Sequence, residues 1–226
     1  MSKAQFVKLM FDDISSKYDL LNDVLSFGMH RIWKKNFVTN VMKSSPQKLL
    51  DCATGTGDLV FMAEKFSNVE VTGIDFSEKM IEQAQKRADH NGSLSRFMTA
   101  DILNLPYANK SFDATMVSFG VRNVEDLEKG LKELSRVSKS LFILEFGQPK
   151  NRFLKLAYFN LLKLYVPIFG IISGRKDAYE YLITSSEQFP SDDKFLQILR
   201  KNSDFKNFVS QPIFGGIAYT YTANGV

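Results

Sequence analysis

The chain has 226 residues, of which 44% are hydrophobic and 24% are charged, and its 29 basic and 25 acidic side chains give a formal net charge of +4. These values are typical of one globular domain with a full hydrophobic core. The lysines are scattered rather than grouped, so the sequence does not indicate a nucleic-acid partner. A single cysteine excludes an internal disulfide, and with only two histidines it argues against a structural zinc site, so we expect no metal.

The N-terminal part of the chain has helical periodicity over roughly residues 3–17 and 29–43. We assign residues 1–45 to a helical cap within a single domain that spans residues 1–226. The first residues, MSKAQFVKLMFDD, lack the apolar core of a signal peptide. We therefore expect a cytoplasmic protein.

The most informative segment is LLDCATGTGD at residues 49–58, where an apolar run stops at a loop that contains Gly55 and Gly57. Glycine has no Cβ atom, so such a loop lets a ligand approach the backbone closely. We predict a buried parallel strand, a helix and a second strand over residues 48–53, 58–66 and 69–75, respectively. This is the first half of a nucleotide-binding βαβ unit, and Asp75 at the end of its second strand can accept hydrogen bonds from ribose hydroxyls.

Two ligands compete for this loop. A dinucleotide fingerprint, G-x-G-x-x-G, needs a third glycine where Val60 stands, and it would place the pyrophosphate beside Asp58. S-adenosylmethionine carries no phosphate, and its sulfonium and ammonium groups tolerate carboxylates such as Asp51 and Asp58. The loop therefore favours S-adenosylmethionine, with a generic Rossmann-like domain as the alternative. For Asp51 the sequence leaves open either direct contact with the donor or a structural role in ordering the loop.

Strands and helices alternate along the following residues in the order of a doubly wound α/β fold. Ser77 is expected to cap a helix that ends at Asn91-Gly92. We predict helices over 78–90 and 124–137, parallel strands over 95–100, 112–119 and 141–146, and an antiparallel edge pair over 205–210 and 213–222. Residues 46–150 then form the donor-binding core, and residues 193–226 form a C-terminal helix with edge strands.

The most apolar window is FLKLAYFNLLKLYVPIFGII at residues 153–172. Two lysines, an asparagine and a proline interrupt it, so we do not expect a membrane span. On a helical wheel the polar side chains gather in one sector and leave a broad apolar face. We assign residues 151–192 to a second helical cap, whose apolar face either packs on the core, covers an apolar ligand or rests on a bilayer.

One pattern extends along nearly the whole chain from residue 11. The segment from Phe11 to Trp33 contains its first part, at Tyr18, Asp19, Asn22, Ser26, His30 and Trp33, and further parts are ATGTGD (53–58), SFGVRN (118–123), ILEFGQP (143–149) and GGIA (215–218). These stretches resemble the ubiquinone/menaquinone biosynthesis C-methyltransferase family. The chain departs from that family at Leu21, where methionine is usual, and at Ser138-Lys139-Ser140, where a Lys-Pro-Gly-Gly turn is usual.

The resemblance implies a class I methyltransferase with a mostly parallel seven-stranded sheet, an antiparallel C-terminal hairpin and a helical cap. It implies that S-adenosyl-L-methionine is the cofactor and that a ring carbon of a polyprenylated quinol is methylated. The family positions that touch the donor map onto Thr56, Asp75, Asp101, Ile102 and Ser118. Asp101 would accept from the adenine amine while Ile102 packs on the ring, and the alternative for Asp101 is that it caps a turn.

A ring carbon becomes a good nucleophile when the neighbouring phenol loses its proton, so catalysis needs a group that favours the phenolate. Arg122 and Asn123, after the predicted fourth strand, should lie beside the ring, where a guanidinium stabilises negative charge. His30 is a candidate base, with a histidine on a helix surface as the alternative. Tyr18 and Asn22 are expected to orient the quinol oxygens.

The substrate is best interpreted as demethylmenaquinol, because the chain is shorter than many ubiquinone-type members of the family. The alternative within the family is 2-methoxy-6-polyprenyl-1,4-benzoquinol. Two further interpretations are a methyltransferase of other specificity and a non-catalytic binding or assembly subunit of a quinone-making complex, and the intact donor residues argue against the second. A homodimer and a peripheral contact with the inner face of a membrane remain open.

Overall fold

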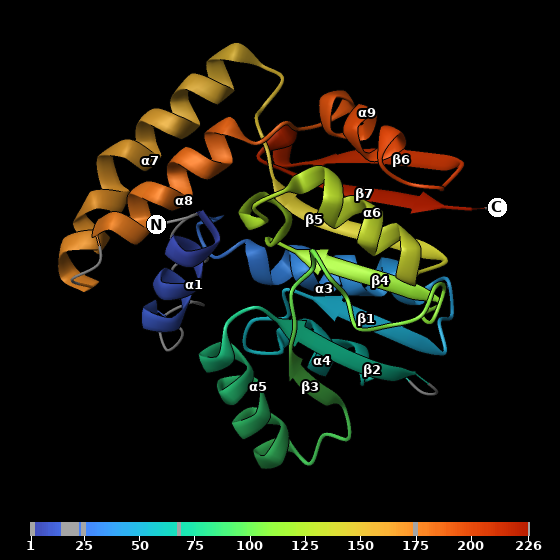
Figure 1. Cartoon of the computed structure of the whole chain (residues 1–226). Coiled ribbons are helices and arrows are strands. Elements are labelled where there is room, and N and C mark those ends of the chain that lie inside the picture. Colours follow the sequence, from blue (N-terminus) through green and yellow to red (C-terminus); the bar gives the residue numbers. More distant parts are fainter. Residues whose placement is uncertain (1–2, 15–22, 24–25, 67–68, 174–175, 226) are drawn as a thin grey trace.

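In the part of the chain that the structure describes, seven strands form one sheet in the order β3-β2-β1-β4-β5-β7-β6 (Figure 1). The computed structural model describes residues 3–14, 23, 26–66, 69–173 and 176–225. The strands are Lys48–Cys52 (β1), Glu70–Asp75 (β2), Arg96–Thr99 (β3), Ala114–Ser118 (β4), Ser140–Phe146 (β5), Asn207–Ile213 (β6) and Ala218–Asn224 (β7). β1 to β5 pair in parallel, and β7 pairs antiparallel with β5 and β6. This topology confirms the predicted α/β class and its antiparallel C-terminal pair.

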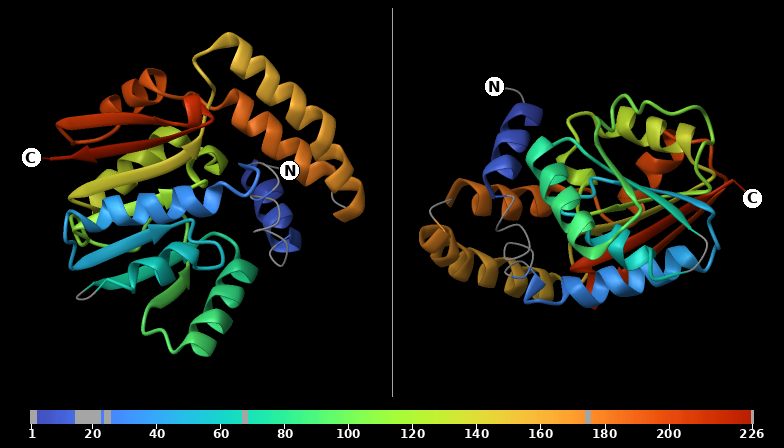
Figure 2. Two further views of the ribbon diagram at one scale, coloured as in Figure 1. Left: turned by 180° about the vertical axis from the view of Figure 1, so that it is seen from behind. Right: turned by 90° about the horizontal axis from the view of Figure 1, so that it is seen from below.

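Helices cover both faces of the sheet and also lie beyond the carboxyl ends of its parallel strands. They are Lys3–Ile14 (α1), His30–Met42 (α3), Asp58–Ala63 (α4), Glu78–Asn91 (α5), Leu127–Val137 (α6), Arg152–Ser173 (α7), Lys176–Gln188 (α8) and Asp193–Lys201 (α9), with the short turns Val121–Asn123 (η2) and Phe214–Gly216 (η3). α3 and α4 lie on one face and α6 and α9 on the other (Figure 2). α1, α7 and α8 lie beyond the carboxyl ends of the parallel strands (Figure 1).

The hydrophobic core is split into two layers by the sheet. Leu49 and Met116 belong to the layer under α3 and α4, and their neighbours Leu50 and Val117 belong to the layer under α6 and α9. All four side chains have no exposed surface. Because successive strand residues point to opposite faces and both faces are covered, these strands carry apolar side chains at consecutive positions rather than only at alternate ones.

The two N-terminal helices have different surroundings. α3 lies on the sheet, and Trp33, Phe37, Val38 and Val41 from it are buried in the core. α1 lies instead over the carboxyl ends of the strands (Figure 1). Of the predicted helix over residues 3–17, the part after Ile14 lies outside the described residues.

Two helix starts show how capping sets the boundaries. The predicted cap of α5 is confirmed, since Ser77 Oγ accepts a hydrogen bond from Met80 N at 3.1 Å. The predicted helix over residues 124–137 is confirmed by α6, but its start was wrong, because Asp126 caps α6 by accepting from Lys129 N at 2.9 Å and the helix begins at Leu127. A separate turn, η2, lies before it at Val121–Asn123.

α7 and α8 pack against each other as a helical hairpin (Figures 1 and 2). The predicted helix over residues 153–172 is confirmed by α7. Phe159 and Leu162 on this helix are buried in the core, whereas Phe153, Leu156 and Leu164 are 84%, 60% and 73% exposed. Within the described residues, no helix is long and apolar enough to cross a membrane.

Candidate active site

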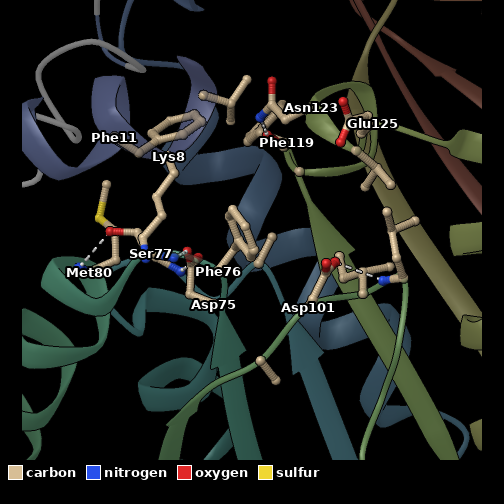
Figure 3. A pocket seen from close by; sticks show the side chains of 18 residues that line it. Lys8, Phe11, Asp75, Phe76, Ser77, Met80, Asp101, Phe119, Asn123 and Glu125 are labelled. Carbon is tan, nitrogen blue, oxygen red and sulfur yellow. Dashed lines mark hydrogen bonds between the residues drawn. The ribbon is translucent and has the colours of Figure 1, made fainter. Parts of the chain in front are cut away.

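A pocket lies at the carboxyl ends of β1, β2 and β4, beneath α1 (Figure 3). The space inside it is about 800 Å³, part of which is open to solvent. Because parallel strands end at the same edge of a sheet, residues distant in sequence meet here. The polar side chains of its lining include Lys8, Asp75, Ser77, Asp101, Asn123 and Glu125.

The backbone around the pocket adopts uncommon conformations. Ala53 after β1 and Phe119 after β4 both have φ of +55°, in the left-handed region. Such residues cost of order 1–3 kcal/mol each and gather at ligand sites. Gly57 has φ of +86°, and a Cβ atom there would approach the ring of Phe61 to 2.9 Å. The glycine at this position is therefore required by both the turn and the packing.

Asp75 lines the pocket at the end of β2, as predicted. Its Oδ2 accepts a hydrogen bond from Gly55 N at 2.8 Å, and its Oδ1 accepts from Ser77 N at 2.9 Å. Burial raises the pKa of Asp75 to about 6, although these backbone amides favour the charged form. The carboxylate is held in a fixed orientation, and each oxygen retains a lone pair for a ligand.

Asp51 lies behind the glycine loop rather than in the lining of the pocket. It is 1% exposed, its Oδ2 accepts from Thr54 Oγ1 at 2.6 Å, and its Oδ1 is buried without a hydrogen-bond partner. Burial raises the pKa of Asp51 to about 7. Of the two roles that the sequence left open, the contact with Thr54 favours the ordering of the loop.

Thr56 and Asp58 are engaged by cations on the far side of the glycine loop. Arg87 on α5 donates to the hydroxyl of Thr56 at 2.7 Å and to Asp58 Oδ1 at 2.8 Å. Lys34 on α3, only 5% exposed, donates to Asp58 Oδ2 at 3.0 Å. Burial alone would raise the pKa of Asp58, but Lys34 and Arg87 hold it at about 2. Neither Thr56 nor Asp58 lines the pocket, and the contacts of Arg87 and Lys34 with these residues were not predicted.

The expected adenine region joins two features in one loop. Asp101 and Ile102 both line the pocket. Asp101 also caps a turn, since its Oδ1 accepts from Leu103 N at 2.8 Å. The turn-capping role named above as the alternative is therefore present, and Asp101 lines the pocket as well. Ser118 is 7% exposed and does not line the pocket, and its Oγ is buried without a hydrogen-bond partner.

On the opposite side of the pocket, the turn η2 carries the two residues expected beside the acceptor. Asn123 lines the pocket, whereas Arg122 is 5% exposed and does not. Arg122 Nη1 donates to Glu145 Oε1 at 2.6 Å and to the carbonyl oxygen of Phe119 at 2.7 Å. The positive charge of Arg122 is thus balanced by the fully buried carboxylate of Glu145, and this ion pair lies behind the lining of the pocket.

His30 lies at the start of α3, is 1% exposed and does not line the pocket. Its Nε2 lies 2.8 Å from Asp23 Oδ1, and its backbone N–H donates to Ser26 Oγ at 3.0 Å. Burial lowers the pKa of His30, and the charge of Lys34 adds to this, so the imidazole is neutral at pH 7. Tyr18 and Asn22 lie outside the described residues.

Helix α1, part of the helical cap expected over residues 1–45, forms a wall of the pocket, although the sequence did not single out Val7 and Lys8. Val7, Lys8 and Phe11 line it, and Lys8 Nζ pairs with Glu78 at the start of α5 at 3.1 Å. A signal existed in the spacing of Val7 and Phe11, which places two apolar side chains on one face of a helix. Phe76 also lines the pocket, and its position directly after Asp75 was a second signal.

Comparison with known proteins then decides the family. Residues 1–224 match the model of the ubiE/COQ5 methyltransferase family. The chain belongs to this family. A ubiE/COQ5 relative from Bdellovibrio bacteriovorus, named ubiquinone/menaquinone biosynthesis C-methyltransferase UbiE, is 38% identical over 96% of this chain and 94% of its own. A relative from Thermotoga maritima, named demethylmenaquinone methyltransferase, is 40% identical over 92% of this chain and 91% of its own.

Solved structures agree on the fold. A SAM-dependent methyltransferase from Thermotoga maritima superimposes with a TM-score of 0.68 at 19% identity and covers 97% of this chain and 100% of its own. An S-adenosyl-L-methionine-dependent methyltransferase from Methanococcus maripaludis superimposes with a TM-score of 0.63 at 17% identity and covers 94% of this chain and 92% of its own. This ubiE/COQ5 family member therefore has the class I methyltransferase fold. It is an S-adenosylmethionine-dependent C-methyltransferase.

Proposed function

We propose that this enzyme methylates a ring carbon of demethylmenaquinol, a polyprenylated quinol. The observation that carries the proposal is a pocket lined by a fixed carboxylate, Asp75, by the amide of Asn123 and by apolar side chains of α1. The name of the Thermotoga maritima relative supports the naphthoquinol over the benzoquinol.

For the donor, we propose that Asp75 binds the ribose hydroxyls and that Asp101 and Ile102 bind the adenine. The bound donor supplies an activated methyl group on sulfur. Gly55 lines the pocket and allows close approach of the ligand to the backbone. We propose indirect roles for the expected donor residues behind the lining, in which they hold the loop and the strand ends: Asp51, Thr56, Gly57 and Ser118.

For the acceptor, we propose that the quinol ring lies beside Asn123 and that the charge of Arg122 favours the phenolate. Arg122 acts from behind the pocket wall, so its effect is electrostatic and needs no direct contact. His30, neutral at pH 7, remains the proposed base, with Tyr18 orienting the quinol oxygens. If His30 is the base, His30→Gln should flatten the acid limb of the pH–rate profile, and an unaltered profile would leave this histidine with a structural role only.

We also propose that the enzyme contacts a membrane surface through α7. The exposed stripe of this helix consists of Phe153, Leu156, Leu161 and Leu164, which lie within one sector of about 140° on a helical wheel at 100° per residue and so share one broad face. Arg152 is exposed at the first turn of the same helix. An apolar stripe beside basic side chains is typical of a helix that lies in the interface of an anionic bilayer.

Methyl transfer to defined lipids tests the proposed substrate. The purified enzyme is incubated with isotopically labelled S-adenosylmethionine and either reduced demethylmenaquinone or the reduced benzoquinol in detergent, and the lipid products are identified by mass spectrometry. We expect label on the naphthoquinol ring. Label on the benzoquinol alone would reassign the substrate, and label on neither would contradict the proposal. Asp75→Ala serves as the donor-site control, with little or no label expected at limiting donor.

A further inference from the structure

The turn η2 is held by three elements that are distant in sequence. Glu145 on β5 accepts from the backbone N–H of Arg122 at 3.2 Å. Lys3 on α1 donates to the carbonyl oxygens of Arg122 and Val124 at 3.1 and 2.8 Å. Tyr181 on α8 donates from its hydroxyl to Oδ1 of Asn123 at 3.2 Å. The turn is therefore the point where two cap helices meet the wall of the pocket.

The amide of Asn123 has both of its ends engaged. Oδ1 accepts from the Tyr181 hydroxyl, and Nδ2 donates to the carbonyl oxygen of Phe119 at 3.3 Å. An amide turned by 180° would set its oxygen against that carbonyl oxygen, which is a repulsive pair of acceptors. The second Nδ2 hydrogen and the second Oδ1 lone pair stay available for a ligand in the pocket that Asn123 lines.

Tyr181 suits the task of a fixed donor. Its ring packs edge to face on Phe6 of α1, with ring centroids 5.5 Å apart, and is partly buried against the core. Burial raises the pKa of Tyr181, so the hydroxyl keeps its proton at neutral pH. The packing involves the ring, and the hydrogen bond involves only the hydroxyl. Tyr181→Phe therefore removes the hydrogen bond and keeps the packing.

We propose that Tyr181 is a positioning residue for methyl transfer, because its hydroxyl fixes the Asn123 amide in the orientation that meets the acceptor ring. The inference rests on the proposed role of Asn123 beside the quinol. It links the cap to the chemistry, since a displacement of α8 would release the amide of a residue on the pocket wall.

A double-mutant cycle on the full-length enzyme tests the link. Turnover of reduced demethylmenaquinone is measured for Tyr181→Phe, Asn123→Ala and the double variant, and donor affinity is measured by calorimetry. We expect Tyr181→Phe to lower kcat about threefold to tenfold, the effect of one neutral hydrogen bond, with KM and donor affinity nearly unchanged. In the Asn123→Ala background the same change should have no further effect. Tyr107→Phe, whose hydroxyl donates to Met98 Sδ outside the pocket, is the matched control and should leave kcat unchanged.

Equal losses of kcat in both backgrounds, or a loss of donor affinity parallel to kcat, would overturn the inference in favour of a structural role for Tyr181. A second readout needs no catalysis. In ¹⁵N-labelled protein, the side-chain amide resonances of Asn123, assigned by their loss in Asn123→Ala, should shift in Tyr181→Phe and stay in place in Tyr107→Phe. Unshifted resonances would also overturn it. If the wild-type enzyme methylates no quinol, the proposed function fails, and this spectrum alone decides whether Tyr181 orients Asn123.

Discussion

The carboxyl ends of β1 and β2 with Asp51 and Asp75, here called the donor edge, and the cap helix α7 depart from the usual distribution of polar and apolar side chains in opposite directions. At the donor edge, Asp51 is 1% exposed, and burial raises the pKa of Asp51 to about 7 and that of Asp75 to about 6. On α7, Phe153 and Leu164 are 84% and 73% exposed. One region removes negative charge from water, and the other leaves hydrocarbon in water.

Both arrangements are unfavourable in the free protein, and each is relieved by a different kind of ligand. A cationic sulfonium compound compensates buried carboxylates, whereas a hydrocarbon surface covers exposed phenylalanine and leucine. This difference supports the proposed division of the reaction, in which the donor binds at the strand ends and the lipid binds at the cap. The following predictions test this proposed division.

The largest effect is expected from Asp51→Asn, measured as the free energy of unfolding against pH. Because the pKa of Asp51 rises from 3.8 to about 7 on folding, the folded protein binds the proton more strongly, and stability falls as the pH rises from about 4 to 7. The variant should therefore gain a few kcal/mol at pH 8, at about 1.4 kcal/mol per pKa unit, and nothing below pH 4. An equal change at both pH values would mean that Asp51 is not buried as a charge.

Asp113→Asn is the control with the opposite sign. Lys139 holds the pKa of Asp113 below its usual value, so this carboxylate stabilises the fold above pH 4 and loses that effect as the pH falls. The variant should be slightly less stable than the wild type at pH 8, and the two should converge in acid.

Arg122→Ala tests the proposed acceptor side of the pocket, where Arg122 lies behind the pocket wall. Removal of an electrostatic group of this kind should lower kcat about 10² or more, while donor affinity stays near normal. The variant also leaves Glu145 buried without its cation, so kcat is compared with that of Arg122→Lys, which keeps a positive charge. Wild-type kcat in Arg122→Ala would remove Arg122 from the catalytic machinery.

Asp75→Ala should weaken S-adenosylmethionine by about 2–3 kcal/mol, the scale of hydrogen bonds to a charged group, as measured by calorimetry. Asp58→Ala is the contrast, because Asp58 faces Lys34 and Arg87 rather than the pocket. Its main cost should appear in the free energy of unfolding, since Lys34 and Arg87 each lose the salt bridge with Asp58, and its loss of donor affinity should be smaller. Unchanged affinity in Asp75→Ala would show that the ribose lies elsewhere.

The smallest effects are expected on the cap. The sequence alone would place Phe159 and Phe169 against the lipid tail, but Phe159 is 3% exposed and belongs to the core, and the side chain of Phe169 lies outside the described residues. Phe153→Ser and Leu164→Ser should instead raise KM for a long-tailed quinol about fivefold each, which corresponds to about 1 kcal/mol, and leave KM for a short-tailed analogue unchanged. Leu94→Ser, at a residue that is 96% exposed far from the cap, should change neither.

Vesicle binding gives the same comparison without turnover. Sedimentation with anionic vesicles should fall in Phe153→Ser and Leu164→Ser, and it should also fall as salt rises. No binding of the wild type at low salt would leave the exposed stripe to another partner, for instance a second copy of the chain detected by its mass in solution.

The sequence predicted those parts of the site that follow directly from local pattern. Asp75 and Gly55 terminate apolar runs, so their position at the strand ends could be read from neighbouring residues. Lys34 and Arg87 could not be predicted, because their contacts with Asp58 depend on how α3 and α5 pack across the loop. Likewise, the residue type of His30 suggests a base, but its burial is decided by tertiary packing.

The position of β5 between β4 and β7 has a consequence for how the chain reaches its folded state. Between β5 and β7 the chain passes through α7, α8, α9 and β6. Because this connection is long, the pairing of β7 with β5 is expected to form slowly. Until then β5, with the sequence SLFILEF, presents an open strand edge and apolar side chains to its surroundings. An intermediate with β1 to β5 assembled can pair with another chain at that edge, so the refolding yield should fall as protein concentration rises.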